Sequence, residues 1–271
     1  MVTNQVIGEA KPYYFGEADA PLYGCFHPAQ ASVRGYAVVL ASPLGDEAIR
    51  IHRAYRQLAL RLSQAGFPTL RFDYFGSGDS AGEDVEATLQ RWQDDLALAI
   101  EEVKKQSGLD RVVLMGLRLG GVLSLRAASQ RQDVHGVVLW EPVTSGSDYI
   151  QSLIEAHETR LNYFFTEPDT DGVPSDILEL LGFSLSAAMR AEIEGLNLFE
   201  VTPPDRLTGV LLVERAATDE AARLKAHLEG QAVRVVYQCL DDPSVWGEDP
   251  DKALIPGQTL KAIMNWMNEN F

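Results

Sequence analysis

A glycine-flanked turn between two apolar runs constrains the fold of this chain most. Residues 111–117 predict a buried strand, and residues 121–129 predict a helix that follows almost at once. Arg118 stands between them, with Gly116 two residues before it and Gly120 two residues after it. Glycine permits both a tight turn and a close approach of two backbones. A strand that turns directly into a helix is typical of a parallel sheet covered by helices.

The same alternation of strand and helix runs through most of the chain and predicts an α/β fold. The first two predicted strands are joined by a polar turn and favour an antiparallel hairpin at the edge of the sheet. The apolar patterns predict strands at 12–15, 22–26, 35–42, 68–74, 111–117, 134–140, 209–214 and 232–240, and helices at 51–64, 87–105, 121–129, 219–229 and 257–268. We therefore expect a mostly parallel, twisted sheet with helices on both faces.

The spacer between the strands 134–140 and 209–214 is too long for a connecting loop. It contains helical patterns at 149–164 and 186–193 around a polar stretch. We expect residues 146–206 to form an inserted helical cap, and residues 1–145 and 207–271 to form the core. The alternative is an excursion that packs on the side of the sheet.

Composition excludes several partner classes. The formal net charge of −16 argues against binding to nucleic acid or to an anionic membrane surface. No run of about 18 apolar residues is present, so no membrane-spanning helix is expected. None of the 5 histidines stands at a metal-ligand spacing, so we expect neither a metal nor another cofactor. The 2 widely spaced cysteines suit a reducing compartment, and the predicted location is the cytoplasm.

Three segments resemble one family of enzymes. Residues 66–80 (GFPTLRFDYFGSGDS) are similar to the strand-and-turn signature of serine-aminopeptidase-like hydrolases. Residues 116–121 (GLRLGG) and 139–143 (LWEPV) resemble the exosortase-A-associated hydrolase branch. The resemblance is best over residues 35–145. It implies the α/β-hydrolase fold, with Arg118 at the place of the nucleophilic serine in the G-x-S-x-G elbow.

The resemblance implies a catalytic triad in the order Ser, Asp or Glu, His, and this chain departs from it twice. A guanidinium stays protonated and cannot attack a carbonyl, so Arg118 is no nucleophile. The loop 241–250, where the histidine belongs, contains none, and the last histidine of the chain is His227. Asp219 and, less well, Glu220 could be the acid, although a carboxylate there also suits the N-terminus of a helix.

What remains of the implied site is a binding apparatus. Leu44 and Gly45 belong to the turn that supplies one oxyanion-hole amide in this fold, and Leu119 would supply the other. The helix N-terminus and Arg118 add positive charge at the same point, which favours a carboxylate or phosphate. We expect Trp246 to close over the site from the loop that would carry the histidine. The predicted ligand is a small anionic or acyl compound.

The partners of Arg118 decide between a structural role and a ligand-binding role for this residue. A buried guanidinium requires compensation, and we expect it from Glu141 first and from Asp73 second. His52 is the histidine that the fold could bring towards the oxyanion pocket. If Arg118 instead clamps a developing anion, then Glu141, Asp73 or His52 could supply acid–base chemistry.

Three functions stay open at this point. The first is a degenerate hydrolase that binds its ligand without serine-type turnover. The second is an enzyme of another mechanism, such as a lyase, an isomerase, or an acyl hydrolase or transferase. The third is a non-catalytic interaction subunit, and a homodimer is compatible with all three. An open cavity beside Arg118 would favour the first two, and a closed Arg118–Glu141 pair without a cavity would favour the third.

Overall fold

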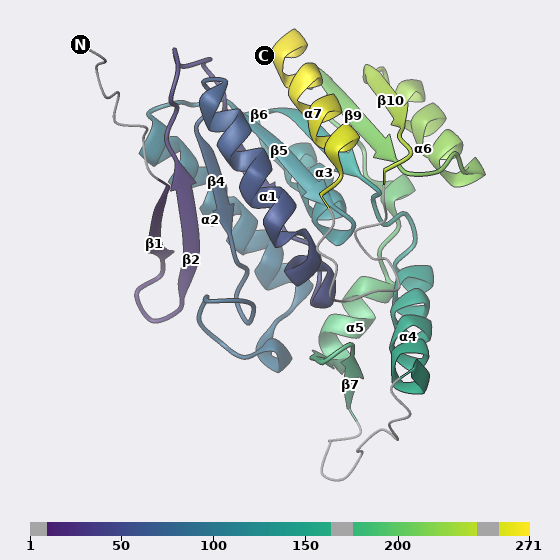
Figure 1. Cartoon of the computed structure of the whole chain (residues 1–271). Coiled ribbons are helices and arrows are strands. Elements are labelled where there is room, and N and C mark those ends of the chain that lie inside the picture. The colour runs from purple at the N-terminus through teal and green to yellow at the C-terminus, as the bar shows by residue number, and fades with distance from the viewer. Residues whose placement is uncertain (1–9, 164–175, 243–254) are drawn as a thin grey trace.

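The computed structural model describes residues 10–163, 176–242 and 255–271, and Figure 1 shows a central sheet with helices around it. Eight strands form this sheet in the order β1-β2-β4-β3-β5-β6-β9-β10. They are β1 (Lys11–Gly16), β2 (Pro21–His27), β3 (Ala37–Ala41), β4 (Thr69–Phe72), β5 (Val112–Leu117), β6 (Val134–Trp140), β9 (Gly209–Glu214) and β10 (Val235–Cys239). The predicted edge hairpin is confirmed, because β1 pairs antiparallel with β2. β2 also pairs antiparallel with β4, and the other pairings in the sheet are parallel.

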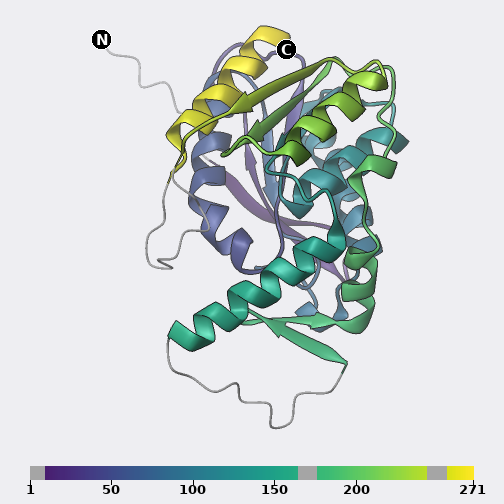
Figure 2. The same cartoon turned by 90° about the vertical axis from the view of Figure 1, so that its right-hand side faces the viewer.

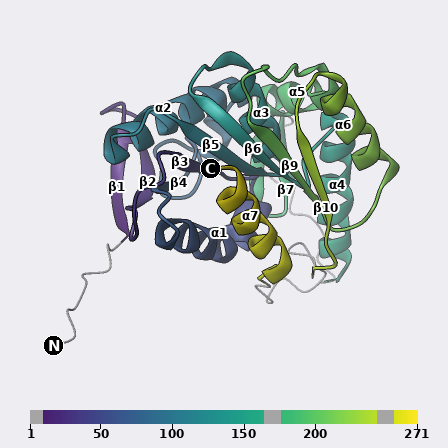
Figure 3. The same ribbon diagram turned by 90° about the horizontal axis from the view of Figure 1, so that it is seen from above.

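Helices cover both faces of the sheet, as Figure 3 shows from above. α1 and α7 pack on one face, and α2, α3 and α6 pack on the other. The helices are α1 (Asp46–Gln64), α2 (Leu89–Ser107), α3 (Leu119–Gln130), α4 (Gly146–Tyr163), α5 (Ala187–Glu194), α6 (Asp219–Gly230) and α7 (Gly257–Asn270). The α/β class, the parallel sheet and the two helical layers expected from the sequence are thus confirmed.

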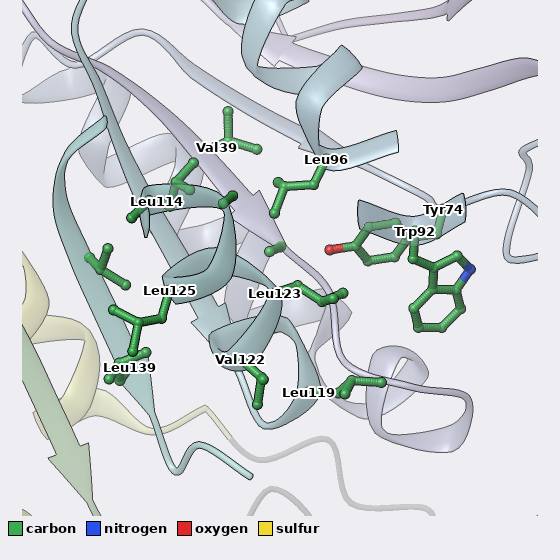
Figure 4. Packing of buried hydrophobic residues seen from close by; sticks show 14 of the residues in the cluster. Val39, Tyr74, Trp92, Leu96, Leu114, Leu119, Val122, Leu123, Leu125 and Leu139 are labelled. Carbon is green, nitrogen blue, oxygen red and sulfur yellow. The ribbon is translucent and has the colours of Figure 1, made fainter. Parts of the chain in front are cut away.

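Alternation along the strands produces two separate cores. Val39 and Leu114 face α2 and α3, whereas Val38 and Val113 face α1 and α7, and all four are fully buried. In the first core Tyr74 lies over the indole of Trp92, with ring centroids 4.6 Å apart and nearly parallel planes. Figure 4 shows this pair together with Leu119, Val122, Leu123 and Leu125 of α3. Such burial fixes each helix on its own face.

The segment between β6 and β9 lies beyond one end of the sheet, where α1 begins (Figures 1 and 2). We call residues 146–206 the inserted segment. It contains the predicted helices, found as α4 and α5, and a hairpin of β7 (Ile177–Leu180) and β8 (Phe183–Ser186) that the sequence did not predict. The hairpin turns through Leu181 and Gly182, both with positive φ, and Leu-Gly is not a usual signal for such a turn. The predicted polar stretch 166–176 lies, apart from its last residue, outside the described residues.

The turn from β5 into α3 brings three backbones together. Arg118 links the two elements with φ 51° and ψ −120°, a conformation that costs a non-glycine residue energy. A Cβ on Gly116 would lie 2.1 Å from the carbonyl oxygen of Gly120. A Cβ on Gly120 would lie 2.3 Å from the carbonyl oxygen of Ala41, at the end of β3. Close approach of the backbones therefore requires glycine at both positions.

We expect Gly120→Ala to destabilise the protein, because the new methyl group meets backbone that cannot move aside. Overpacking of this kind costs at least about 1–3 kcal/mol of unfolding free energy, measurable by urea denaturation. Gly230→Ala is the matched control, since a Cβ there has nothing within 4 Å. Equal stability of the two variants would contradict the close approach at the elbow.

Candidate functional site

A buried ion pair holds the guanidinium at the elbow. Arg118 Nε lies 3.1 Å from Glu47 Oε1, and the two side chains are 25% and 9% exposed. The Tyr149 hydroxyl donates a hydrogen bond of 2.7 Å to Glu47 Oε2. The Arg118 guanidinium carbon also lies 5.1 Å from the centre of the Tyr149 ring, within range of a cation–π interaction. We call Arg118, Glu47 and Tyr149 the elbow cluster.

The sequence analysis named Glu141 and Asp73 as partners of Arg118 and did not consider Glu47, which the structure pairs with it. The apolar periodicity placed the start of this helix at residue 51, whereas α1 begins at Asp46 after Gly45. Gly45 has φ 54° and ψ −125°, close to the values of Arg118, and it turns the chain into the helix. Glu47 therefore stands in the first turn of α1, where the helix dipole also favours a carboxylate.

The two expected partners, Glu141 and Asp73, follow the ends of β6 and β4. Glu141 follows β6 with φ 42°, and its amide donates to the carbonyl of Val213 at 2.8 Å. Burial opposes the charge of Arg118, but Glu47, Tyr149 and then Glu141 keep the pKa of Arg118 above its ordinary value. Asp73 accepts a hydrogen bond from the Asp79 amide at 3.1 Å. Glu141 thus acts on Arg118 through its charge.

Glu214 is a functional candidate that the sequence analysis missed. It is the last residue of β9 and is largely withdrawn from solvent at the same end of the sheet. Burial, reinforced by the nearby charge of Glu141, raises the pKa of Glu214 to about 8, although Arg118 opposes the shift. The available signal was a single acidic residue that closes an otherwise apolar strand. The candidates chosen instead, Asp219 and Glu220, lie in the first turn of α6.

A cavity of about 680 Å³ lies between α1, the loop after β4 and the inserted segment. Its wall on the side of the inserted segment is mostly apolar and consists of Leu153, Leu180, Leu181, Phe183, Leu185 and Met189, together with Ser184. The opposite wall carries the polar groups of Tyr23, Cys25, Asp46, Glu47, His52, Arg71, Asp73, Ser77, Asp79 and Asp84. Arg118 is not among the described residues that line it, whereas its partner Glu47 is.

The other predicted site residues fall into three groups. Leu44, Gly45 and His52 line the cavity. Burial and the charge of Arg71 lower the pKa of His52, although Asp73 opposes them. Leu119 is the fully buried first residue of α3. Trp246, and with it the predicted closure over the site, lies outside the described residues.

Within residues 10–163, 176–242 and 255–271, no group of three or more His, Cys, Asp or Glu side chains could hold a metal ion. Nor does a helix in those ranges have the length and hydrophobicity needed to cross a membrane.

Comparison with known proteins supports the fold and the resemblance seen in the sequence. Residues 37–170 match the family model of the serine aminopeptidases, S33. Est1E from Butyrivibrio proteoclasticus, solved with bound ferulic acid, superposes with a TM-score of 0.64 over 95% of this chain and 98% of that chain. The protein has the α/β-hydrolase fold. Est1E is 18% identical to it, so this likeness concerns the fold.

Two curated relatives match shorter stretches of this α/β-hydrolase-fold protein. An uncharacterized 31.7 kDa Escherichia coli protein from the traX-finO intergenic region is 37% identical over 78 residues, or 28% of this chain and 27% of that protein. Human mitochondrial palmitoyl-protein thioesterase ABHD10 is 37% identical over 68 residues, or 25% of this chain and 21% of that protein. The matches thus span about a quarter of the length of these relatives.

Removal of Glu47 should destabilise the protein strongly. Glu47→Ala deletes the carboxylate that contacts the buried guanidinium, and breaking such a pair costs about 3–5 kcal/mol of unfolding free energy. Replacing both partners by Leu should recover much of the loss. Glu194→Ala, in an exposed pair with Arg190, should cost at most about 1 kcal/mol. Urea denaturation of the four proteins tests this, and similar losses for Glu47→Ala and Glu194→Ala would contradict it.

Glu214 should make stability depend on pH. Its folded-state pKa of about 8 lies above the ordinary 4.5, so the folded protein binds the proton more tightly. The protonated Glu214 therefore stabilises the folded state. This contribution to the free energy of unfolding is complete below pH 4.5 and is lost as the pH rises through 8. Glu214→Gln should remove this part of the dependence and raise the melting temperature at pH 9 relative to the wild type. Glu155→Gln on the exposed face of α4 controls for the charge change, and parallel profiles for Glu214→Gln and wild type would contradict the shift.

Proposed function

We propose that this α/β-hydrolase-fold protein is a degenerate hydrolase that binds a small anionic or acyl ligand and lacks serine-type turnover. The elbow cluster is the observation that carries the proposal. Arg118 occupies the turn between β5 and α3, and its guanidinium contacts Glu47 and packs on Tyr149. A residue held in this way offers no nucleophile and no vacant elbow in which water could be activated.

The cavity supports a binding role. Its volume of about 680 Å³ lies in the range of small-molecule sites. The apolar wall from the inserted segment suits an acyl chain, and burial of each methylene group contributes about 0.8 kcal/mol. Est1E was solved with ferulic acid, and ABHD10 is named a palmitoyl-protein thioesterase. From these two proteins we carry over to this chain only the proposal that its ligand has an acyl group.

A second candidate is an enzyme of another mechanism, such as a lyase, an isomerase or an acyl transferase. One observation favours it: His52 and Asp73 line the same cavity and interact electrostatically. They could act as base and acid there. An electrostatic clamp by Arg118 is less well supported, because its guanidinium is engaged by Glu47. The cytoplasmic location and a homodimer stay predictions from the sequence.

Binding of a fluorescent fatty acid tests the proposed function. Dansylaminoundecanoic acid should bind saturably to the wild type. Leu153→Trp narrows the cavity and should weaken binding at least about tenfold. Leu60→Trp makes the same change at an exposed position of α1 and should leave the affinity unaltered. The proposal falls if the probe does not saturate, or if the two variants bind it alike.

Loss of serine chemistry has its own test. A fluorophosphonate should label no serine stoichiometrically, in the wild type or in Arg118→Ser. The new hydroxyl would lack a base in the histidine-free loop 241–250, and an unactivated serine is a weak nucleophile. Hydrolysis of p-nitrophenyl esters should therefore stay at background in both proteins. A large gain in turnover from Arg118→Ser would show that another histidine, His52 first, serves as the base.

A further inference from the structure

Arg118 is not the cation that faces the cavity. Its guanidinium contacts Glu47 and Tyr149, and Glu47 lines the cavity whereas Arg118 is not among the described lining residues. Of the described residues that line the cavity, Arg71 is the only arginine or lysine. A ligand that carries a negative charge would therefore meet Arg71.

The position of Arg71 follows from strand alternation. Leu70 and Phe72 on either side of it point into the core shared with α2 and α3. Arg71 consequently points to the opposite face, towards α1, and it is half-buried there. Its neighbour across the antiparallel pair is Cys25 of β2, which also lines the cavity.

The charge of Arg71 is not offset by an ion pair with any described residue. Its Nε donates to His27 Nε2 at 3.3 Å. Burial, then the charges of Arg71 and Arg56, lower the pKa of His27 to about 4. His27 is therefore neutral at pH 7 and contributes no compensating charge. A guanidinium presents five N–H donors, and a carboxylate can accept two of them in parallel.

The carboxylates of the cavity limit which anion fits. Asp46 pairs with Arg50 and Arg160, and Glu47 pairs with Arg118. Asp84 accepts the amide of Ser184 at 2.7 Å. Asp73 and Asp79 remain on the polar wall near Arg71, and burial raises the pKa of Asp73. These two acids disfavour a multiply charged head group such as a phosphate, whereas a single carboxylate matches one guanidinium.

We infer that the cavity binds a long-chain carboxylate, with its head group on Arg71 and its chain against the apolar wall of the inserted segment. The inference rests on the proposed function and names the ligand class and the residue that recognises its charge. The guanidinium on one side and the apolar side chains of α4, β7, β8 and α5 on the other give the ligand a fixed direction. His52 is an exposed residue of the polar wall. It would lie beside the head group of the ligand.

Calorimetry with three ligands of equal chain length tests the head group. Dodecanoate, dodecanol and dodecylammonium are titrated below their micellar concentrations into the wild type, Arg71→Gln and Arg53→Gln. Dodecanoate should bind the wild type most tightly. Arg71→Gln should weaken dodecanoate at least about tenfold and leave dodecanol unchanged. Arg53→Gln, an exposed position on α1 outside the cavity, should change none of the three affinities.

Asp73→Asn should change the affinity for dodecanoate in the opposite direction. It removes a carboxylate whose pKa the charge of Arg71 lowers. Dodecanoate should therefore bind more tightly and dodecylammonium more weakly. Tightest binding of dodecylammonium to the wild type would overturn the assignment of Arg71. Equal binding of all three ligands, insensitive to Arg71→Gln, would overturn it as well but leave the proposed function intact. Absence of binding by all three would overturn both.

Alkylation of the two cysteines tests the location in the unmodified protein. Cys25 lines the cavity across from Arg71, whereas Cys239 is exposed at the end of β10. Saturating dodecanoate should slow the reaction of Cys25 with N-ethylmaleimide and leave that of Cys239 unchanged, as peptide mass spectrometry can follow. Unaltered reaction of Cys25 would contradict binding at Arg71, whatever the stability of the Arg71 variants.

Discussion

The close approach of backbones at the elbow determines where the other parts of the site can lie. Gly120 meets the end of β3 without room for a Cβ, and Gly116 meets Gly120 in the same way. The first turn of α3 is thereby held against two strand ends, and Arg118 is forced into a conformation that few side-chain-bearing residues adopt. The side chain at this position has to project over the edge of the sheet, and the start of α1 supplies the charge that meets it.

The elbow cluster also joins the two parts of the chain. Tyr149 belongs to the inserted segment, and its hydroxyl reaches the same carboxylate that Arg118 contacts. Arg160, farther along α4, contacts Asp46 in the first turn of α1. On the other side of the cavity, Glu192 of α5 accepts the amide of Leu89 at 2.6 Å. The apolar wall is therefore attached to the core on two sides of the cavity.

Elements with strong local patterns could be predicted, and contacts between distant elements could not. The strands 134–140 and 209–214 have the predicted bounds, because each is a continuous apolar run between turn residues. The first turn of α1 was missed because its residues are mostly polar. The Glu47–Tyr149 contact joins positions 102 residues apart and depends on how α4 lies over the sheet. Arg71 stood inside a recognised motif, but only the burial of its neighbours shows that it faces a cavity.

The elbow cluster couples position 118 to position 47. A neutral residue in place of Arg118 would leave the buried carboxylate of Glu47 with the Tyr149 hydroxyl as its described partner. A change at either position alone should therefore lower the stability of the folded protein, whereas a paired change to apolar residues should be tolerated. We expect the two positions, 71 residues apart in the sequence, to vary together among related chains.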